Sequence, residues 1–107
     1  MPSTRLHIDT ISSLDWVEAI VQVGGALDAQ TAPELLREIT RLRQNGANRI
    51  LLDLTGVESI DAEGVDVLLH VRRQMHYEDG VFGVVGIGDT ALESLRRAGV
   101  ADVLGCD

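Results

Sequence analysis

A short and nearly continuous run of large aliphatic residues lies near the middle of this chain, from Ile50 to Leu54. Only Asp53 interrupts it. Such a run is typical of a strand that is covered on both faces, as in the centre of a parallel sheet. Helices supply that cover, and right-handed crossovers join the parallel strands. The run therefore predicts an α/β fold with this strand inside the sheet.

Two strands are predicted at the start of the chain. Residues 5–10 alternate between polar and apolar side chains, which indicates an edge strand. Residues 12–15 form a plausible turn, and the β-branched residues within 16–23 indicate a second strand that pairs with the first as a hairpin. Gly24-Gly25 is expected to end this second strand.

A helix is predicted between this hairpin and the central strand. Thr31 is positioned to cap it, Pro33 is tolerated in the first turn, and Glu34 completes a capping box. Apolar residues follow at helical spacing, and Asn45-Gly46 supplies the stop.

The second half of the chain repeats the alternation of helix and strand. Helical periodicity runs from Asp61 to about Tyr77, an apolar strand follows at residues 81–85, and a third helix covers residues 89–99. Residues 100–104 form a short strand or a packed tail. The predicted order is ββαβαβα, with a mixed sheet of four to five strands and about three helices in one domain, residues 1–107.

Composition narrows the classes of function. Hydrophobic residues make up 45% of the 107-residue chain and aromatics only 3%, so the core is expected to be aliphatic. The formal net charge is -8, from 17 acidic and 9 basic residues. This charge repels nucleic acid backbones and anionic membrane surfaces. It favours a basic protein partner, or else it only keeps a small protein soluble.

Cysteine usage and hydropathy indicate the compartment. Cys106 is the one cysteine, so no internal disulfide can form, which suits a reducing environment. No apolar stretch approaches the ~20 residues of a membrane helix, and the N-terminus lacks the pattern of a signal peptide. The sequence therefore predicts a cytoplasmic location without direct membrane insertion.

Three local patterns occur in an order and spacing that resemble a known family. Gly25-Ala26-Leu27-Asp28 followed by Thr31-Ala32 resembles a G-x-L-D-x-x-T-A turn, and residues 50–54 with Val57 resemble a central strand and its exit. Residues 59–69, SIDAEGVDVLL, resemble a signature loop and helix that usually reads I-D-S-S-G-L-G-V-L-L. These are patterns of the STAS domain (sulfate transporter and anti-sigma factor antagonist), and the resemblance covers nearly the whole chain.

The resemblance implies a switch in the signature loop. In antagonists of this family the second serine of D-S-S-G accepts a phosphoryl group from an anti-sigma factor kinase, and only the unmodified form binds the anti-sigma factor. By position, Asp61 matches the aspartate, Ala62 the first serine and Glu63 the phosphoacceptor. Gly64 matches the glycine and Val65 the following apolar residue. Glutamate therefore replaces the residue that relatives phosphorylate.

The chemistry of Glu63 permits two interpretations. An anion in the first turn of a helix stabilises it by about 0.3–1 kcal/mol, so Glu63 and Asp61 could serve only the helix start. Alternatively, its single charge, against about -1.5 to -2 for phosphoserine, holds the surface in a state that resembles the phosphorylated one. Ser59 carries the hydroxyl group nearest in sequence to Glu63 and is therefore the alternative phosphorylation site. Its place at the end of a strand predicts that its side chain is buried.

The predicted partner surface joins the loop from Ser59 to Val65 to the turn at Asp28 and Thr31. Asp28 has two possible roles: it only forms the turn after Leu27, or it also adds to an acidic patch with Asp61 and Glu63. Val65 and Leu68 are expected in the core, with contact to a partner as the alternative. The resemblance implies an anti-sigma factor or a GHKL-type serine kinase as partner. The alternative is a stand-alone subunit that binds the ATPase of an ABC-type transporter.

Other candidate sites carry weak signals. His70 and His76 do not lie four residues apart, so they do not present a shared helical face to a metal. Gly86-Ile87-Gly88 precedes a helix but lacks the spacing of a P-loop, so it indicates loop geometry, with nucleotide binding as the less favoured reading. Cys106 has no convincing base nearby, and Asp53 has no converging cleft residues. We therefore predict no catalytic residue, metal or cofactor.

Overall fold

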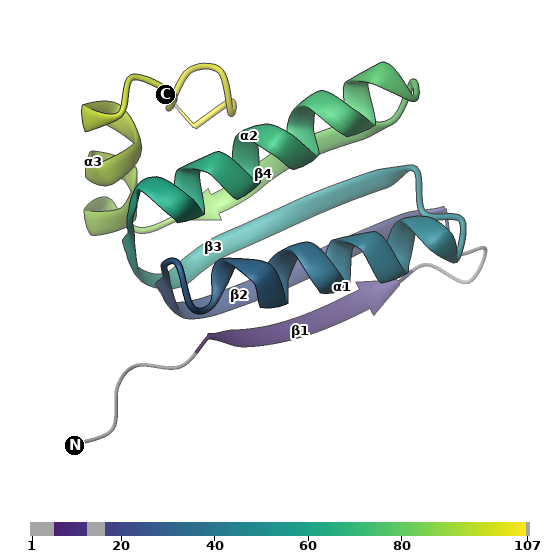
Figure 1. The fold of residues 1–107 in the computed structure, drawn as a ribbon, viewed down its shortest axis with the longest axis horizontal. Coiled ribbons are helices and arrows are strands. Elements are labelled where there is room, and N and C mark those ends of the chain that lie inside the picture. The colour runs from purple at the N-terminus through teal and green to yellow at the C-terminus, as the bar shows by residue number, and fades with distance from the viewer. Residues whose placement is uncertain (1–5, 13–16, 107) are drawn as a thin grey trace.

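The computed structural model describes residues 6–12 and 17–106, which form a four-stranded sheet with three helices (Figure 1). The predicted element order is confirmed. The strands are β1 (His7–Ser12), β2 (Glu18–Leu27), β3 (Arg49–Ile60) and β4 (Val81–Ile87), in the spatial order β1-β2-β3-β4. The helices are α1 (Ala32–Gln44), α2 (Ala62–Tyr77) and α3 (Asp89–Arg97).

The sheet is mixed, as predicted. β1 pairs antiparallel with β2, with His7 opposite Gly24, while β2, β3 and β4 run parallel. The predicted strand end at Gly24-Gly25 is wrong, because β2 continues to Leu27 in parallel pairing with β3. Shifts of register beside both glycines, and a φ of 95° at Gly25, accommodate this extension. Of the turn predicted at residues 12–15, residues 13–15 lie outside the described part of the chain.

Both long helices pack on the same face of the sheet (Figure 1). The chain visits β2, β3 and β4 in one direction across the sheet, so right-handed crossovers place α1 and α2 on one side. The prediction that the central strand is covered on both faces is therefore wrong. Ile50, Leu52 and Leu54 are fully buried beneath the helices, whereas Leu51 and Asp53 on the other face are only half-buried.

An aliphatic core fills the space between the sheet and the helices, as the composition predicted. α1 contributes Leu35, Ile39 and Leu42, and it ends where Gly46 takes a φ of 104°. The chain after α3 forms turns instead of a strand, and Ala101 and Leu104 are buried. This agrees with the packed-tail alternative.

Candidate functional site

The two loops predicted to form one surface meet at the carboxyl ends of β2 and β3. Ala26 lies opposite Ser59 and Leu27 opposite Ile60 in the parallel register. The backbone N–H of Asp61 donates a hydrogen bond of 3.0 Å to the carbonyl of Leu27. Because the carboxyl ends of parallel strands share one edge of the sheet, the turn at Asp28 and the start of α2 are neighbours.

Asp28 and Thr31 organise the turn that follows β2. The Asp28 carboxylate accepts hydrogen bonds from the backbone N–H groups of Gln30, at 2.9 Å, and Thr31, at 3.1 Å. The Thr31 hydroxyl donates to the Ala26 carbonyl at 2.6 Å and accepts from the Asp28 N–H at 2.9 Å. These bonds support the turn-forming reading of Asp28.

The predicted capping box at α1 is wrong. The side chain of Thr31 makes no capping hydrogen bond to the helix, because its hydroxyl points back to β2. The carbonyl of Asp28 instead accepts from the N–H groups of Thr31 and Ala32, so an extra turn leads into the helix. The pattern of residue types was compatible with either arrangement, and the bond to Ala26, five residues earlier, accompanies this one.

The start of α2 has the cap that the sequence predicted. Asp61 is the N-cap residue, and its carboxylate accepts a 3.1 Å hydrogen bond from the Gly64 N–H. Gly64 is buried against β2: a Cβ there would lie 2.6 Å from the Leu27 carbonyl oxygen and 3.0 Å from a methyl of Ile60. Close approach of the helix to β2 therefore requires glycine at this position.

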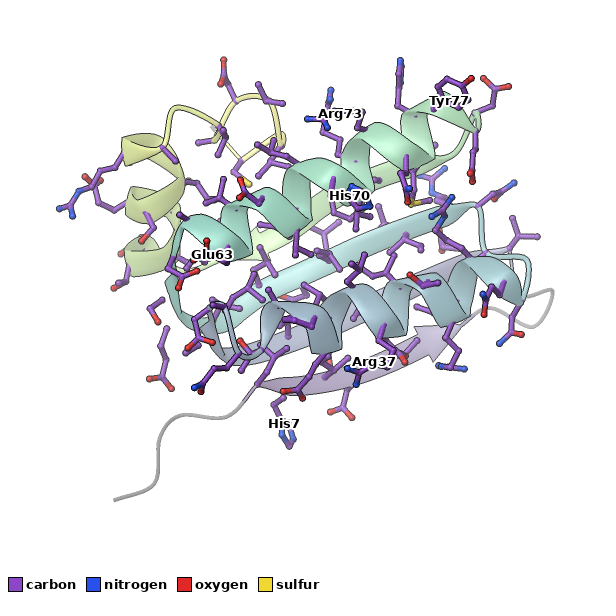
Figure 2. The ribbon with its side chains drawn as sticks, in the orientation of Figure 1. His7, Arg37, Glu63, His70, Arg73 and Tyr77 are labelled. Carbon is purple, nitrogen blue, oxygen red and sulfur yellow. The ribbon has the colours of Figure 1, made fainter. Side chains whose placement is uncertain are left out.

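The exposed part of this helix start is small and acidic. Ala62 and Glu63 are exposed in the first turn of α2, and Glu63 projects from its tip (Figure 2). The partial positive charge of the helix N-terminus favours a carboxylate at this place. Val65 and Leu68 are buried in the core, as expected, so the exposed loop presents little apolar surface.

The prediction that Ser59 is buried is wrong, because its side chain is exposed. Along this part of β3 the buried residues are Val57 and Ile60, with two exposed residues between them. The register shifts between β2 and β3 alter the simple alternation of faces, and no pattern in the sequence predicts these shifts.

α3 contributes residues that the sequence reasoning missed. A hollow beside the start of α2 is lined by Asp61 and Asp66 on one side and by Ser94 and Arg97 of α3 on the other. Arg97 also forms an ion pair with Glu93, at 3.5 Å. Only the packing of α3 against the carboxyl end of β3 brings this cation to the acidic loop, so no local pattern could have identified it.

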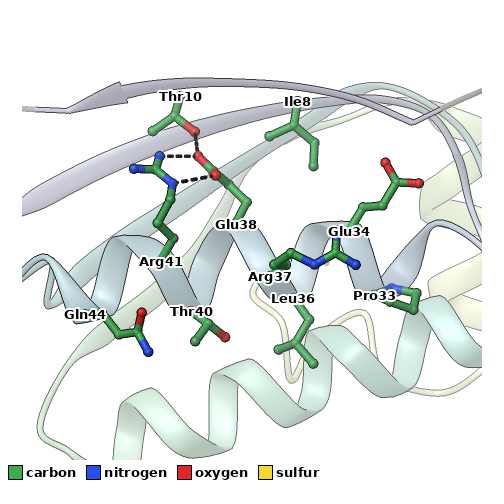
Figure 3. Close-up of a pocket in the computed structure, with 10 residues that line it drawn as sticks. All are labelled: Ile8, Thr10, Pro33, Glu34, Leu36, Arg37, Glu38, Thr40, Arg41 and Gln44. Atoms are coloured by element: carbon green, nitrogen blue, oxygen red, sulfur yellow. Dashed lines mark hydrogen bonds and ion pairs between the residues drawn. The ribbon is translucent and has the colours of Figure 1, made fainter.

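A larger groove lies elsewhere, between β1 and the outer side of α1 (Figure 3). It contains a polar network in which Glu38 accepts hydrogen bonds from Thr10, at 2.5 Å, and from Arg41, at 2.8 and 3.0 Å. The bonds from Arg41, aided by Thr10, hold the pKa of Glu38 below its usual value. The network stabilises the packing of α1 on β1, since its groups satisfy one another.

The described residues include no group of three side chains suited to hold a metal ion. His7 and His70 lie on different elements and point in different directions (Figure 2). A Cβ at Gly86 would lie 2.7 Å from the Thr55 hydroxyl and 2.8 Å from the Asp53 carboxylate. The prediction that Gly86-Ile87-Gly88 forms a loop is wrong for its first two residues, which belong to β4, where Gly86 leaves room for the side chains of Thr55 and Asp53.

The fold and the site together define a small α/β domain with an exposed acidic loop at the tip of a helix. The sequence model of the STAS domain matches residues 7–106, and the chain belongs to this family. Within the described ranges, no helix is long and apolar enough to cross a membrane.

Individual relatives agree with this assignment. The chain is 28% identical over 100 residues to the anti-sigma-B factor antagonist of Staphylococcus aureus. The aligned residues cover 94% of this chain and 91% of that protein. Its fold matches an anti-sigma factor antagonist from Mycobacterium paratuberculosis with a TM-score of 0.79 and 21% identity, over 94% of this chain and 83% of that one. It also matches unphosphorylated SpoIIAA, an anti-sigma factor antagonist, with a TM-score of 0.75 and 13% identity, over 90% and 84% of the two chains.

Proposed function

We propose that this protein is a regulatory binding module that binds an anti-sigma factor, or a related GHKL-type kinase, through the start of α2. One observation carries the proposal: the Asp28 turn and the exposed α2 start are hydrogen-bonded neighbours, through Asp61 and the Leu27 carbonyl. Homology to proteins named anti-sigma factor antagonists supports a role in protein binding. The surface joins the exposed residues of the segment from Ser59 to Glu63 to the turn at Asp28. Thr31, Gly64 and Val65, which the sequence also assigned to the surface, are buried and support it from below.

The second part of the proposal concerns regulation. Glu63 stands at the position that the family resemblance assigns to the phosphoacceptor serine, and it is exposed at the helix tip. A carboxylate cannot accept a phosphoryl group as a serine hydroxyl does. The module therefore binds its partner constitutively, or it binds a partner that prefers the acidic surface, with a fixed single charge in place of a reversible charge of about -1.5 to -2.

A binding measurement tests the role of this charge. The purified protein is titrated against a GHKL-type anti-sigma factor kinase, and Glu63→Arg is expected to weaken binding about tenfold or more, because it reverses the charge in the contact. Glu34→Arg is the matched control, since Glu34 is also an exposed acidic residue in a first helical turn, that of α1. Equal affinities of the wild type and Glu63→Arg would reduce Glu63 to a residue that only stabilises the helix start.

A phosphorylation assay tests the loss of the switch. After incubation with the same kinase and ATP, the intact mass of the wild-type protein is expected to be unchanged, whereas Glu63→Ser gains one phosphoryl group. Phosphorylation of the wild-type loop, including the exposed Ser59, would contradict the proposal. Recovery of an ABC-type ATPase instead of a GHKL protein in a pull-down would favour the transport alternative.

A further inference from the structure

The face of the sheet opposite α1 and α2, here called the open face, carries a second set of ordered side chains. Three of its apolar members lie in one row across β1, β2 and β3, because Ile11 pairs with Ile20 and Ile20 with Leu51, and the row ends at Gly83 on β4. Ile11 is 57% exposed, and Ile20 and Leu51 are half-buried. Three strands at ~4.8 Å spacing make this an apolar stripe of about 10 Å.

An acidic row lies directly beside the apolar one. Asp9 pairs with Gln22, and Gln22 pairs with Asp53. Asp53 accepts hydrogen bonds from the Thr55 hydroxyl at 2.6 Å and the Thr55 N–H at 3.0 Å, and these bonds hold its pKa below the usual value. Within the described residues, neither carboxylate has a cationic partner.

The charges on the other side of the apolar row are compensated. Glu18 and Arg49 are neighbours in the register and form an ion pair at 2.8 Å. The open face therefore presents an apolar row with unneutralised negative charge along one side only.

The acidic row borders a hollow. In the next row His7 pairs with Gly24, and Gly24 pairs with Gly56, so two of the three positions carry no side chain. The space left there is about 280 Å³, and both Asp9 and Asp53 line it. Its size and its two carboxylates suit the end of a lysine or arginine side chain.

We propose that the open face binds a basic amphipathic helix of another protein, independently of the surface at the start of α2. Successive side chains on one face of a strand lie about 6.7 Å apart, and residues i and i+4 of a helix are separated by about 6 Å along its axis. A partner helix that lies along the strands therefore places an apolar side chain on the row of Ile20 and Leu51. One turn later it places a cationic side chain between Asp9 and Asp53.

The negative charge of the protein favours a cationic helix over a second copy of this chain or an anionic lipid surface as the binding partner. A second copy of this chain carries the same net charge of -8 and repels the first. Anionic lipid surfaces are repelled for the same reason. A cationic helix gains both the apolar contact and the attraction to Asp9 and Asp53.

The test uses a synthetic, fluorescein-labelled helical peptide of leucine and lysine, about 24 Å long at 1.5 Å per residue. The control peptide has the same composition in an order that is not amphipathic. Fluorescence anisotropy is expected to show saturable binding of the first peptide that weakens with salt and binding of the control that is at least about tenfold weaker. NMR amide shifts are expected at Ile11, Ile20, Leu51 and Asp53. Equal binding of both peptides, or shifts centred on α2, would overturn the proposal.

Two variants locate the contact further. Asp9→Lys and Ile11→Lys are each expected to weaken peptide binding about tenfold, because both positions are exposed edge-strand sites within the proposed contact. Glu34→Lys makes the same change of charge as Asp9→Lys, and it is expected to change the affinity by no more than about twofold, because Glu34 lies on the α1 side of β1 and not on the open face. Equal losses in Asp9→Lys and Glu34→Lys would show unspecific charge attraction and refute the assignment. Concentration-dependent dimerisation that Ile11→Lys abolishes would also refute it, in favour of a second copy.

Discussion

Replacement of Gly64 by alanine tests the packing that positions the proposed binding loop. A Cβ at this position would lie 2.6 Å from the Leu27 carbonyl oxygen, 2.9 Å from the Leu27 Cγ and 3.0 Å from the Ile60 Cγ2. The nearest of these atoms belongs to the backbone of β2, so rotation of a side chain cannot relieve the contact. The same carbonyl accepts the hydrogen bond from Asp61, so a shift of α2 away from β2 also weakens that bond.

The expected change in the free energy of unfolding follows from two destabilising effects and one stabilising effect. Overpacking of a tightly packed site costs about 1–3 kcal/mol, and a weakened hydrogen bond adds about 0.5–1.5 kcal/mol. Alanine in a helix gains up to about 1 kcal/mol over glycine. We therefore expect Gly64→Ala to lower the free energy of unfolding by about 0.5–4.5 kcal/mol.

Urea denaturation followed by far-UV circular dichroism measures this loss. The transition midpoint is expected to fall while the m-value stays constant, as for a change in stability alone. Glu63→Ala is the control, because Glu63 is exposed in the same turn and its loss is expected to cost at most about 1 kcal/mol. A Gly64→Ala protein as stable as the wild type, or more stable, would show that helix propensity dominates and that the close approach of α2 to β2 is not required.

The other predictions concern the polar contacts around the site and in the β1–α1 groove. Thr31→Val removes the hydroxyl bonded to Ala26 and is expected to cost about 1–3 kcal/mol in urea unfolding, because buried polar groups lose a partner. Asp61→Ala removes the helix cap and is expected to cost about 0.5–2 kcal/mol, measured in the same way. The pKa of Glu38 is lowered in the folded state, so its contribution is complete above the unfolded-state value of about 4.3 and is lost as the pH falls through the lower folded-state value. Thermal unfolding across this acid range is expected to show a smaller loss of stability for Glu38→Gln than for the wild type, and identical profiles would contradict the role of its bonds to Arg41.

Local sequence patterns predicted the parts of the site that local chemistry decides. Asp61 caps α2 as expected, because an acidic residue directly before a helical repeat has nearby N–H donors to satisfy. Thr31 also precedes a helix directly, but its side chain makes no capping hydrogen bond to α1. Its hydroxyl is bonded to Ala26, five residues earlier, where the bend after β2 brings the carbonyl within reach.

The sequence by itself determined the order of strands and helices, the aliphatic core and the negative charge, because each of these depends on residue type and short-range periodicity. Tertiary structure decided which faces are covered. The run from Ile50 to Leu54 looks buried throughout, yet the handedness of the crossovers places both long helices on one side and leaves Leu51 at the other surface. It also brought Arg97 of α3 to the acidic loop, since that proximity depends on packing between segments far apart in the chain.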